Sequence, residues 1–419
     1  EGPTPISALI HAATMVTAGI FMVARMSPLY EFSETALSFV LVIGATTAFF
    51  TGLIGLVQND IKRVVAYSTL SQLGYMITAL GASAYAAGVF HLMTHAFFKA
   101  LLFLAAGSVI IGMHHDQDIR NMGGIRKYMP ITWITSLLGS LALIGFPFFS
   151  GFFSKDAIIE AVGHAERFGS TYAHWLLVAG VFVTALYSFR MFFLVFHGEG
   201  PRHFEPHHDV LDEHGDAEAQ EHHPVHDEPR PHESPWVVTL PLILLAIPSV
   251  VIGWFTIGPM LFGDFFKDVL FVARENDVLA ELGAHFHGPM SFVTHGVTGL
   301  PFILSMLGLA TAFILYMVKK QWALELKLRF DWLHTLLDKK YFMDEIVQFV
   351  FAGGARLLGK VFWKGGDQFA IDGVAVNGSA HSVGKLAGVM RYLQTGLINH
   401  YAIAMIIGLI GLIYWFALR

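Results

Sequence analysis

The chain has 419 residues, of which 54% are hydrophobic and only 14% are charged, with a formal net charge of −6. A soluble domain carries about a quarter charged residues, so much of this apolar surface must face something other than water. The absence of cysteine excludes disulfides and thiolate-ligated iron–sulfur clusters within the chain. No basic patch of the kind that binds nucleic acid is present, and no G-x-G-x-x-G segment follows a predicted strand, which excludes a Rossmann dinucleotide site.

Long apolar runs recur along the chain, and each is long enough to cross the roughly 30 Å of a bilayer's hydrocarbon core as a helix. We therefore predict an all-α, polytopic membrane bundle with about nine spans. Their expected limits are 5–25, 36–57, 61–82, 84–112, 131–164, 172–197, 236–257, 300–318 and 400–418.

Loop charges predict the orientation of these spans. Basic residues gather in loops that would share one face: Lys62, Arg63, Arg120, Arg126, Lys127 and the stretch after Val318. The opposite face would carry Glu31, Glu34 and the acidic segment 264–281. The positive-inside rule makes the basic face cytoplasmic, with Glu1 inside and Arg419 in the periplasm. Because the first residue is Glu1 and a span follows almost at once, we expect that an upstream half precedes this sequence.

The segment 199–235 is rich in His, Asp, Glu and Pro and has no periodic apolar stripe. Nine histidines lie between His197 and His232, counting both ends. Such a tract can bind metal, but scattered spacing and interruption by proline favour a solvated soluble loop.

A second non-spanning region, about 330–395, has apolar residues at helical spacing with charged residues between them. This pattern predicts an amphipathic helix that lies along a surface, reaching roughly 80 Å at 1.5 Å per residue. Gly353-Gly354 and Gly365-Gly366 indicate kinks. A set of short interfacial helices folded back on the bundle is the alternative.

The fourth predicted span contains His91, His95 and Lys99. Residues four apart share a helix face, so these three form a stripe of about 12 Å. Ionisable groups in an apolar span are costly and normally face the bundle interior. Because burial disfavours the charged form, a lysine here can exchange its proton, and neighbouring histidines can relay it. The spacing therefore favours a proton path over three separate structural side chains.

The fifth predicted span is unusually long and is interrupted at Gly145-Phe146-Pro147 and again at Ser150-Gly151. Proline removes a backbone donor, so we predict a helix broken inside the membrane. A break exposes amides and carbonyls that can hold a charged side chain. Lys155 follows the break and is predicted to titrate, with Asp156 as its modulator; a lysine that reaches the interface is the alternative.

Two further residues are weaker candidates for the proton path. His11 lies in the first span, where Thr14 and Thr17 could hydrogen-bond to it or hold water, and a purely structural histidine is equally compatible. Lys62 begins the third span and could reach inward, whereas Arg63 is expected at the headgroups.

Several of these segments carry a family resemblance. Asp60 to Tyr75 (DIKRVVAYSTLSQLGY) resembles the antiporter-like subunits of respiratory complex I and of Mrp-type cation/proton antiporters. The segments HLMTHAFFKALLFLAAGSVI (91–110), RNMGGIRK (120–127) and FFSKD (152–156) are more specifically similar to the L-type (subunit 5) branch found in bacterial NADH:quinone oxidoreductase. The amphipathic stretch followed by one more span is also similar to that branch.

The resemblance implies a division of the chain. Residues 1–198 would form the second antiporter-like repeat, 199–235 a soluble loop and 236–320 additional transmembrane helices. Residues 321–398 would be the family's lateral helix, and 399–419 a C-terminal anchor. The family's first repeat would be mostly missing, so we expect this sequence to be incomplete as a pump on its own.

The resemblance also implies a function, namely proton translocation by a membrane subunit of a bacterial NADH:quinone oxidoreductase in the inner membrane. Its proton path would use His11, Lys62, His91, His95, Lys99, Lys155 and Asp156. NADH, FMN, iron–sulfur clusters and quinone would bind partner subunits, and this chain would hold no cofactor or metal. Its partners would be other membrane-arm subunits and the lipid bilayer. The alternatives are a subunit of a cation/proton antiporter or membrane-bound hydrogenase, and a purely structural clamp of the membrane arm.

Overall fold

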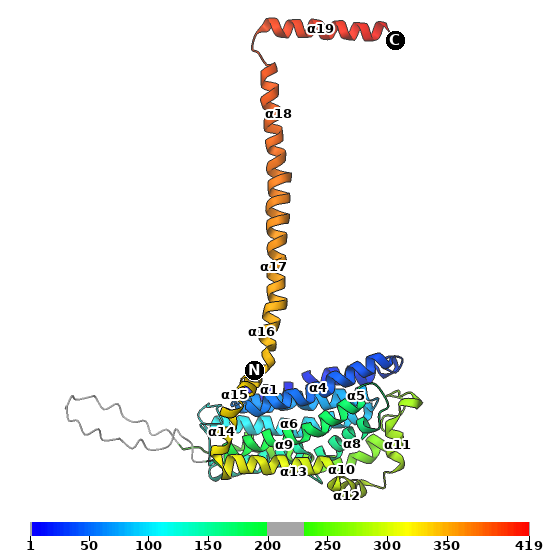
Figure 1. Ribbon diagram of the computed structural model, residues 1–419, viewed down its shortest axis with the longest axis vertical. Helices are drawn as coiled ribbons and strands as arrows, with labels where there is room; N and C mark the ends of the chain where they lie inside the picture. Colours follow the sequence, from blue (N-terminus) through cyan, green and yellow to red (C-terminus); the bar gives the residue numbers. More distant parts are fainter. Residues whose placement is uncertain (1, 199–229, 419) are drawn as a thin grey trace, which may run out of the picture. The chain divides into compact units, whose positions relative to one another are not determined.

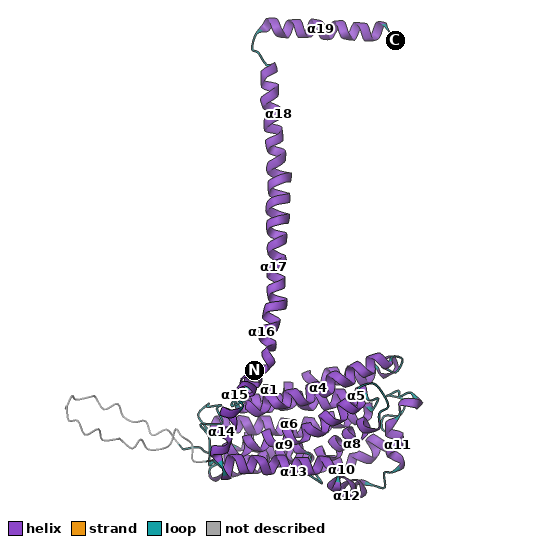
Figure 2. Ribbon diagram, viewed as in Figure 1, coloured by secondary structure: helices purple, strands orange, loops and turns teal. Residues whose placement is uncertain are grey.

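The computed structural model describes residues 2–198 and 230–418, so most of the His-rich segment lies outside the described residues. The described chain consists of helices and loops, without a strand (Figures 1 and 2). It divides into two units, Glu1–Asp338 and Lys339–Arg419. The prediction of an all-α fold is confirmed.

The first unit contains fifteen of the labelled α-helices. They are α1 (Thr4–Ala12), α2 (Ala18–Arg25), α3 (Ser27–Tyr30), α4 (Glu34–Val57), α5 (Ile61–Gly81), α6 (Tyr85–Gly112), α7 (Pro130–Ile144), α8 (Ser150–His164), α9 (Ser170–Phe196), α10 (Trp236–Ile257), α11 (Val278–Ala284), α12 (Pro289–Thr298), α13 (Leu300–Phe313), α14 (Lys320–Arg329) and α15 (Asp331–Asp338). In Figure 1 the long helices of this unit lie side by side.

Within the described residues, eight helical segments are long and apolar enough to cross a membrane. Six lie in the first unit: Thr4–Arg25, Glu34–Val57, Tyr85–Gly112, Ser170–Phe196, Trp236–Phe262 and Leu300–Val318. Each matches a predicted span closely. The predicted span 61–82 is also a helix, α5, but its many polar residues keep it out of this apolar set.

Two helices are broken inside the bundle. The predicted break is confirmed, because α7 ends at Ile144 and α8 starts at Ser150, with Gly145 in a left-handed conformation (φ 76°) that closes the helix. A second break separates α1 from α2 at Ala13–Thr14, within what the sequence predicted as one continuous span.

Small residues let α4 and α5 pack closely. A Cβ atom on Gly44 would lie 2.6 Å from the backbone nitrogen of Thr78, and one on Gly74 would run into the backbone of Ala48. Close backbone approach through small residues is a main source of helix association in membranes. This packing fixes α5, which carries several polar side chains toward the interior.

The second unit is a long helix followed by α19 (Ile398–Ala417). A helical stretch of 54 residues, Lys340–Leu393, begins with a kink of left-handed residues at Lys340–Phe342 and includes α16 (Met343–Val347), α17 (Gly353–Val361) and α18 (Ser379–Leu393). Of the two predicted kink sites, Gly365-Gly366 lies in a π-helical stretch, Phe362–Gly378, and Gly353-Gly354 begins α17 directly after another π-helical turn, Gln348–Ala352. The alternative of several short interfacial helices is therefore wrong for this stretch, although 321–338 does form two short helices, α14 and α15, in the first unit.

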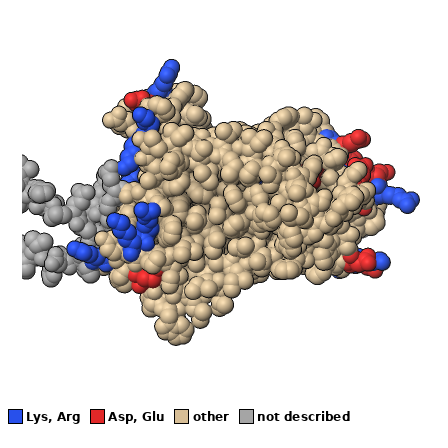
Figure 3. Space-filling view, turned by 90° about the horizontal axis from the view of Figure 1, so that it is seen from below, with Lys and Arg blue, Asp and Glu red and all other residues tan. Residues whose placement is uncertain are grey.

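Charged side chains gather at the two ends of the first unit. On the face that Figure 3 shows, Lys and Arg predominate at one end, and Asp and Glu predominate at the other. The loop charges predicted this separation of positive and negative charge, with an apolar band between. We call the Lys- and Arg-rich end the basic end and the Asp- and Glu-rich end the acidic end.

Candidate functional site: a row of buried ionisable side chains

The stripe predicted on the fourth span lies wholly inside the bundle. His91, His95 and Lys99 of α6 are 1%, 0% and 0% exposed. An isolated buried charge is costly, so such groups need polar partners in the interior. Each of the three has at least one.

Lys99 is held by α5. Its Nζ donates to Ser68 Oγ at 2.6 Å and to the Val65 carbonyl at 3.3 Å. Ser68 Oγ also lies 2.7 Å from the hydroxyl of Tyr187 in α9. Lys99 thus starts a hydrogen-bonded chain that joins three helices.

His91 connects α6 to the broken helix. Its Nδ1 lies 2.7 Å from Ser154 Oγ of α8, and its Nε2 lies 3.3 Å from Gln72 Oε1 of α5. Thr94 Oγ1 lies 2.8 Å from the same Ser154 hydroxyl. Because Ser154 directly precedes Lys155, the histidine stripe and the lysine of α8 belong to one polar region.

His95 is anchored at the break in the first helix pair. Its Nδ1 is 3.1 Å from the carbonyl oxygen of Ala12, at the end of α1, and therefore donates to it. Its Nε2 is buried without a hydrogen-bond partner in the described chain. Such atoms are the usual points at which interior water binds.

Lys155 lies in the first turns of α8, just after the predicted break, and is 2% exposed. Its Nζ lies 3.5 Å from the Leu143 carbonyl near the end of α7 and 4.8 Å from the ring centroid of Tyr75. The helix break supplies the carbonyl, and the aromatic face supplies a second cation contact. The structure therefore holds Lys155 in the interior of the bundle.

The row continues beyond Lys155 along α8. Asp156 is adjacent, and Glu160 follows one helical turn later on the same face. Glu160 Oε1 lies 3.3 Å from Nδ1 of His295 in α12. A Cβ atom on Gly296 would lie 2.6 Å from Asp156 Oδ2, so α12 approaches Asp156 closely only because this position is glycine.

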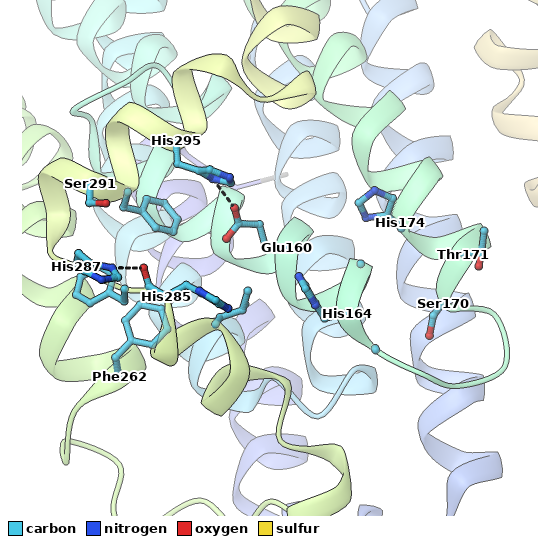
Figure 4. Close-up of a pocket in the computed structure, with 15 residues that line it drawn as sticks. Glu160, His164, Ser170, Thr171, His174, Phe262, His285, His287, Ser291 and His295 are labelled. Atoms are coloured by element: carbon cyan, nitrogen blue, oxygen red, sulfur yellow. Dashed lines mark hydrogen bonds and ion pairs between the residues drawn. The ribbon is translucent and has the colours of Figure 1, made fainter.

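Beside Glu160, a cavity of about 680 Å³ lies toward the acidic end. Its polar lining includes Glu160, His164, His174, His285, His287 and His295. Figure 4 shows Glu160 and His295 facing each other, with His164 and His174 on the other side of Glu160. No group of three His, Asp or Glu among the described residues is placed to hold a metal ion.

Two predicted residues stand apart from this row. His11 is partly exposed and stacks on Phe103, with ring centroids 5.6 Å apart. The hydroxyls of Thr14 and Thr17 donate to backbone carbonyls, that of Thr14 to Leu9 and that of Thr17 to Ala13. Lys62 is half-buried in the first turn of α5, and no hydrogen bond or ion pair among the described residues links it to Lys99.

Sequence reasoning missed the residues that complete the row, namely Ser68, Gln72, Tyr75, Tyr187, Glu160 and His295. Ser68, Gln72 and Tyr75 recur at helical spacing in a predicted span, a signal that could have predicted a polar inner face on α5. Glu160, four residues after Asp156, could have been found in the same way. The partner helix of His295 is far away in sequence, and no local pattern indicates it.

Known protein sequences resemble this chain over almost its whole length. Residues 1–186 match a family described as NADH:quinone oxidoreductase/Mrp antiporter, transmembrane. The chain is 56% identical over 419 residues to NADH-quinone oxidoreductase subunit L of Neisseria meningitidis, covering 99% of this chain and 61% of that relative. It is 40% identical over 480 residues to subunit L of Rhodobacter capsulatus, covering 99% of this chain and 64% of the relative. The chain thus spans about three fifths of the length of the curated relatives that it matches.

The fold is also similar to a chain in the Mrp complex from a Dietzia species, with a TM-score of 0.59 and 23% identity. That alignment covers 92% of this chain and 38% of the other. At this identity the likeness supports the polytopic helical fold and nothing more specific.

Proposed function

This chain belongs to the family of antiporter-like membrane subunits that NADH:quinone oxidoreductases share with Mrp antiporters, and on that premise we propose that it carries part of the proton path of a bacterial NADH:quinone oxidoreductase. The observation that carries the proposal is the row of ionisable and polar side chains, most of them buried, that extends from Lys99 to Glu160. A bundle needs no such row for stability, because buried ionisable groups cost free energy unless they are paired.

The protons move between Lys99 and Lys155 by way of the two histidines. His91 and His95 accept and return a proton on their ring nitrogens, and Ser154 bridges α6 and α8. Small cavities of about 10 Å³ each border Lys99 and Lys155. This is close to the least volume that holds one water, so single waters can complete the hydrogen-bonded path.

From Lys155 the path continues along α8 to the cavity at the acidic end. Asp156 accepts the proton beside the lysine, and Glu160 with His295 passes it into the cavity. The positive-inside rule makes the basic end cytoplasmic, so the cavity faces the periplasm; the predicted periplasmic position of Arg419 concerns a residue outside the described ones. Charge changes passed from neighbouring subunits drive these proton transfers. Those partner subunits bind NADH, FMN, iron–sulfur clusters and quinone.

A cation/proton antiporter subunit is the second candidate, favoured by the same family match, because the description of that family also names the Mrp antiporter. Identity of 56% with a subunit L favours the quinone reductase. Proton transport that depends on sodium and not on NADH would identify an antiporter subunit.

The test uses inside-out vesicles that carry the assembled complex with Lys155→Ala in the full-length subunit. NADH-driven proton uptake and quinone reduction are followed together. We expect fewer protons per electron with the complex still assembled. Equal rates in the variant and the parent would make Lys155 a structural residue and move the proton path elsewhere.

A further inference from the structure

A column of buried hydroxyl groups lies along α7, outside the row described above. Thr132, Ser136 and Ser140 are spaced by four residues, so they share one face of the helix and cover about 12 Å along its axis. All three are buried. Because α7 starts after the basic loop that follows α6, this hydroxyl column leads from the basic end into the interior of the bundle.

The inner end of the hydroxyl column meets Lys99. Ser140 and Lys99 line the same small cavity, together with Ser68. Hydroxyls in membrane helices commonly donate to a carbonyl one turn back, as Thr135 of α7 does to Ile131 at 2.8 Å. Ser140 Oγ, in contrast, is buried and has no hydrogen-bond partner in the described part of the chain. Such a group is where interior water binds, next to the amine of Lys99.

The middle of the hydroxyl column borders a second small cavity. Ser136 lines it, and the other described lining residues are apolar. Both cavities have a volume of about 10 Å³, close to the least that holds one water, and they share Leu102 and Met191 as walls. They are therefore neighbours along α7. Hydroxyls one helical turn apart are separated by roughly 6 Å, which a single water between them can bridge.

The outer end of the hydroxyl column carries a carboxylate. Glu233 Oε2 accepts from the backbone nitrogens of Ile131 and Thr132, at 2.8 and 3.3 Å, and so caps the start of α7. Its Oε1 accepts from the Thr132 hydroxyl at 2.5 Å. Capping uses one oxygen, and the other is directed at the column. Glu233 is half-buried, so one side of the carboxylate remains in contact with solvent.

On the basis of the proposed function, we propose that Glu233 and the hydroxyl column are the route by which protons from the basic, cytoplasmic end reach Lys99. The carboxylate of Glu233 takes a proton from solvent and passes it to the oxygen of Thr132. Each hydroxyl in turn accepts a proton on a lone pair and gives its own proton to the next water. The last transfer converts the neutral amine of Lys99 to an ammonium, and only O–H and N–H bonds form or break.

The test uses inside-out vesicles that carry the assembled complex, with the changes made in the full-length subunit. Ser140→Val and Ser140→Thr add nearly the same volume to the interior, but only threonine keeps a hydroxyl. We expect Ser140→Val to lose as much NADH-driven proton uptake as Lys155→Ala does, whereas Ser140→Thr should retain most of it. A packing role would affect both variants alike. Native gels measure the amount of assembled complex for each variant.

Further variants test the rest of the route. Ser136→Val and Ser136→Thr repeat the comparison one turn nearer the basic end, and decide the matter if a change at Ser140 prevents assembly. Glu233→Gln keeps an oxygen for the Thr132 hydroxyl but cannot carry a proton, so it should also lower proton uptake. The matched control is Thr135→Val, which removes a buried hydroxyl of α7 outside the column and should pump as the parent does.

The outcomes separate this route from the proposed function on which it rests. If Ser140→Val pumps as the parent does while Lys155→Ala pumps poorly, the route is overturned and the proposed function stands. If both variants pump normally, the proposed function falls and the route falls with it. Equal losses in the valine and threonine variants would assign the hydroxyls to helix packing and also overturn the route.

Discussion

Side chains in the interior of the first unit and side chains on the long helix of the second unit have opposite environments. In the bundle, lysines and histidines are buried and hydrogen-bonded, as Lys99 is to Ser68. Along Lys340–Leu393 no residue is buried, and large apolar side chains such as Phe349 remain 84% exposed. The bundle satisfies its costly groups internally, whereas the long helix leaves its apolar surface unused within its own unit.

This difference indicates separate roles for the two regions: chemistry in the bundle, and assembly on the long helix. Buried ionisable groups that are paired inside one unit are suited to a task carried out there. An apolar helix surface without internal contacts is typical of a segment that binds a membrane surface or other chains. Substitutions in the two regions should therefore change different measurements.

The largest expected effect concerns packing. Gly74→Leu places a side chain where the backbone of Ala48 lies, and neither α4 nor α5 can move without disturbing the interior. Overpacking of this kind should cost about 3 kcal/mol or more. Loss of folded protein on gentle heating, measured by fluorescence-detected size exclusion, checks it. Gly384→Leu is the control, because a Cβ there meets nothing within 4 Å; equal losses in both variants would contradict the comparison.

The second-largest effect is expected in the row of buried ionisable side chains of the bundle. Lys99→Met keeps the length of the side chain but removes its proton, and NADH-driven proton uptake should fall about a hundredfold, as for the loss of a proton-transfer group. The control is Lys360→Met on α17, which should leave proton uptake unchanged. If Lys99→Met pumps normally in an assembled complex, then the buried row is structural.

The sequence was most informative where a pattern is local. Spacing by four residues predicted the stripe of His91, His95 and Lys99, and Gly145 with Pro147 predicted the broken helix. The long helix could be predicted from its amphipathic period. The break between α1 and α2 carries no proline or glycine, so nothing in the sequence indicates it. The pairing of Glu160 with His295 depends on the packing of α8 against α12, which no periodicity encodes.

A smaller effect is expected on the long helix. Leu357 and Leu358 of α17 are 64% and 59% exposed. If this surface contacts neighbouring subunits, Leu357→Asp should weaken assembly about tenfold, since burying a leucine contributes roughly 1.5–3 kcal/mol. The share of intact complex on native gels measures this. The thermal stability of the chain itself should not change, and a drop there would mean that Leu357 packs within the unit.

The smallest effect concerns the basic end. Hydrogen bonds from Arg120 lower the pKa of the Asp118 carboxyl from its ordinary value of about 3.8. The stabilisation from this pair is therefore fully present above that ordinary value and is lost as the pH falls through the lower pKa of the folded protein. Asp118→Asn should cost less than about 1 kcal/mol, because Arg120 is 61% exposed and water screens the pair. Thermal melts at pH 7 and at acidic pH check the sign: the variant and the parent should differ at pH 7 and converge in acid. A difference that widened in acid would mean that Asp118 stabilises the fold through its protonated form.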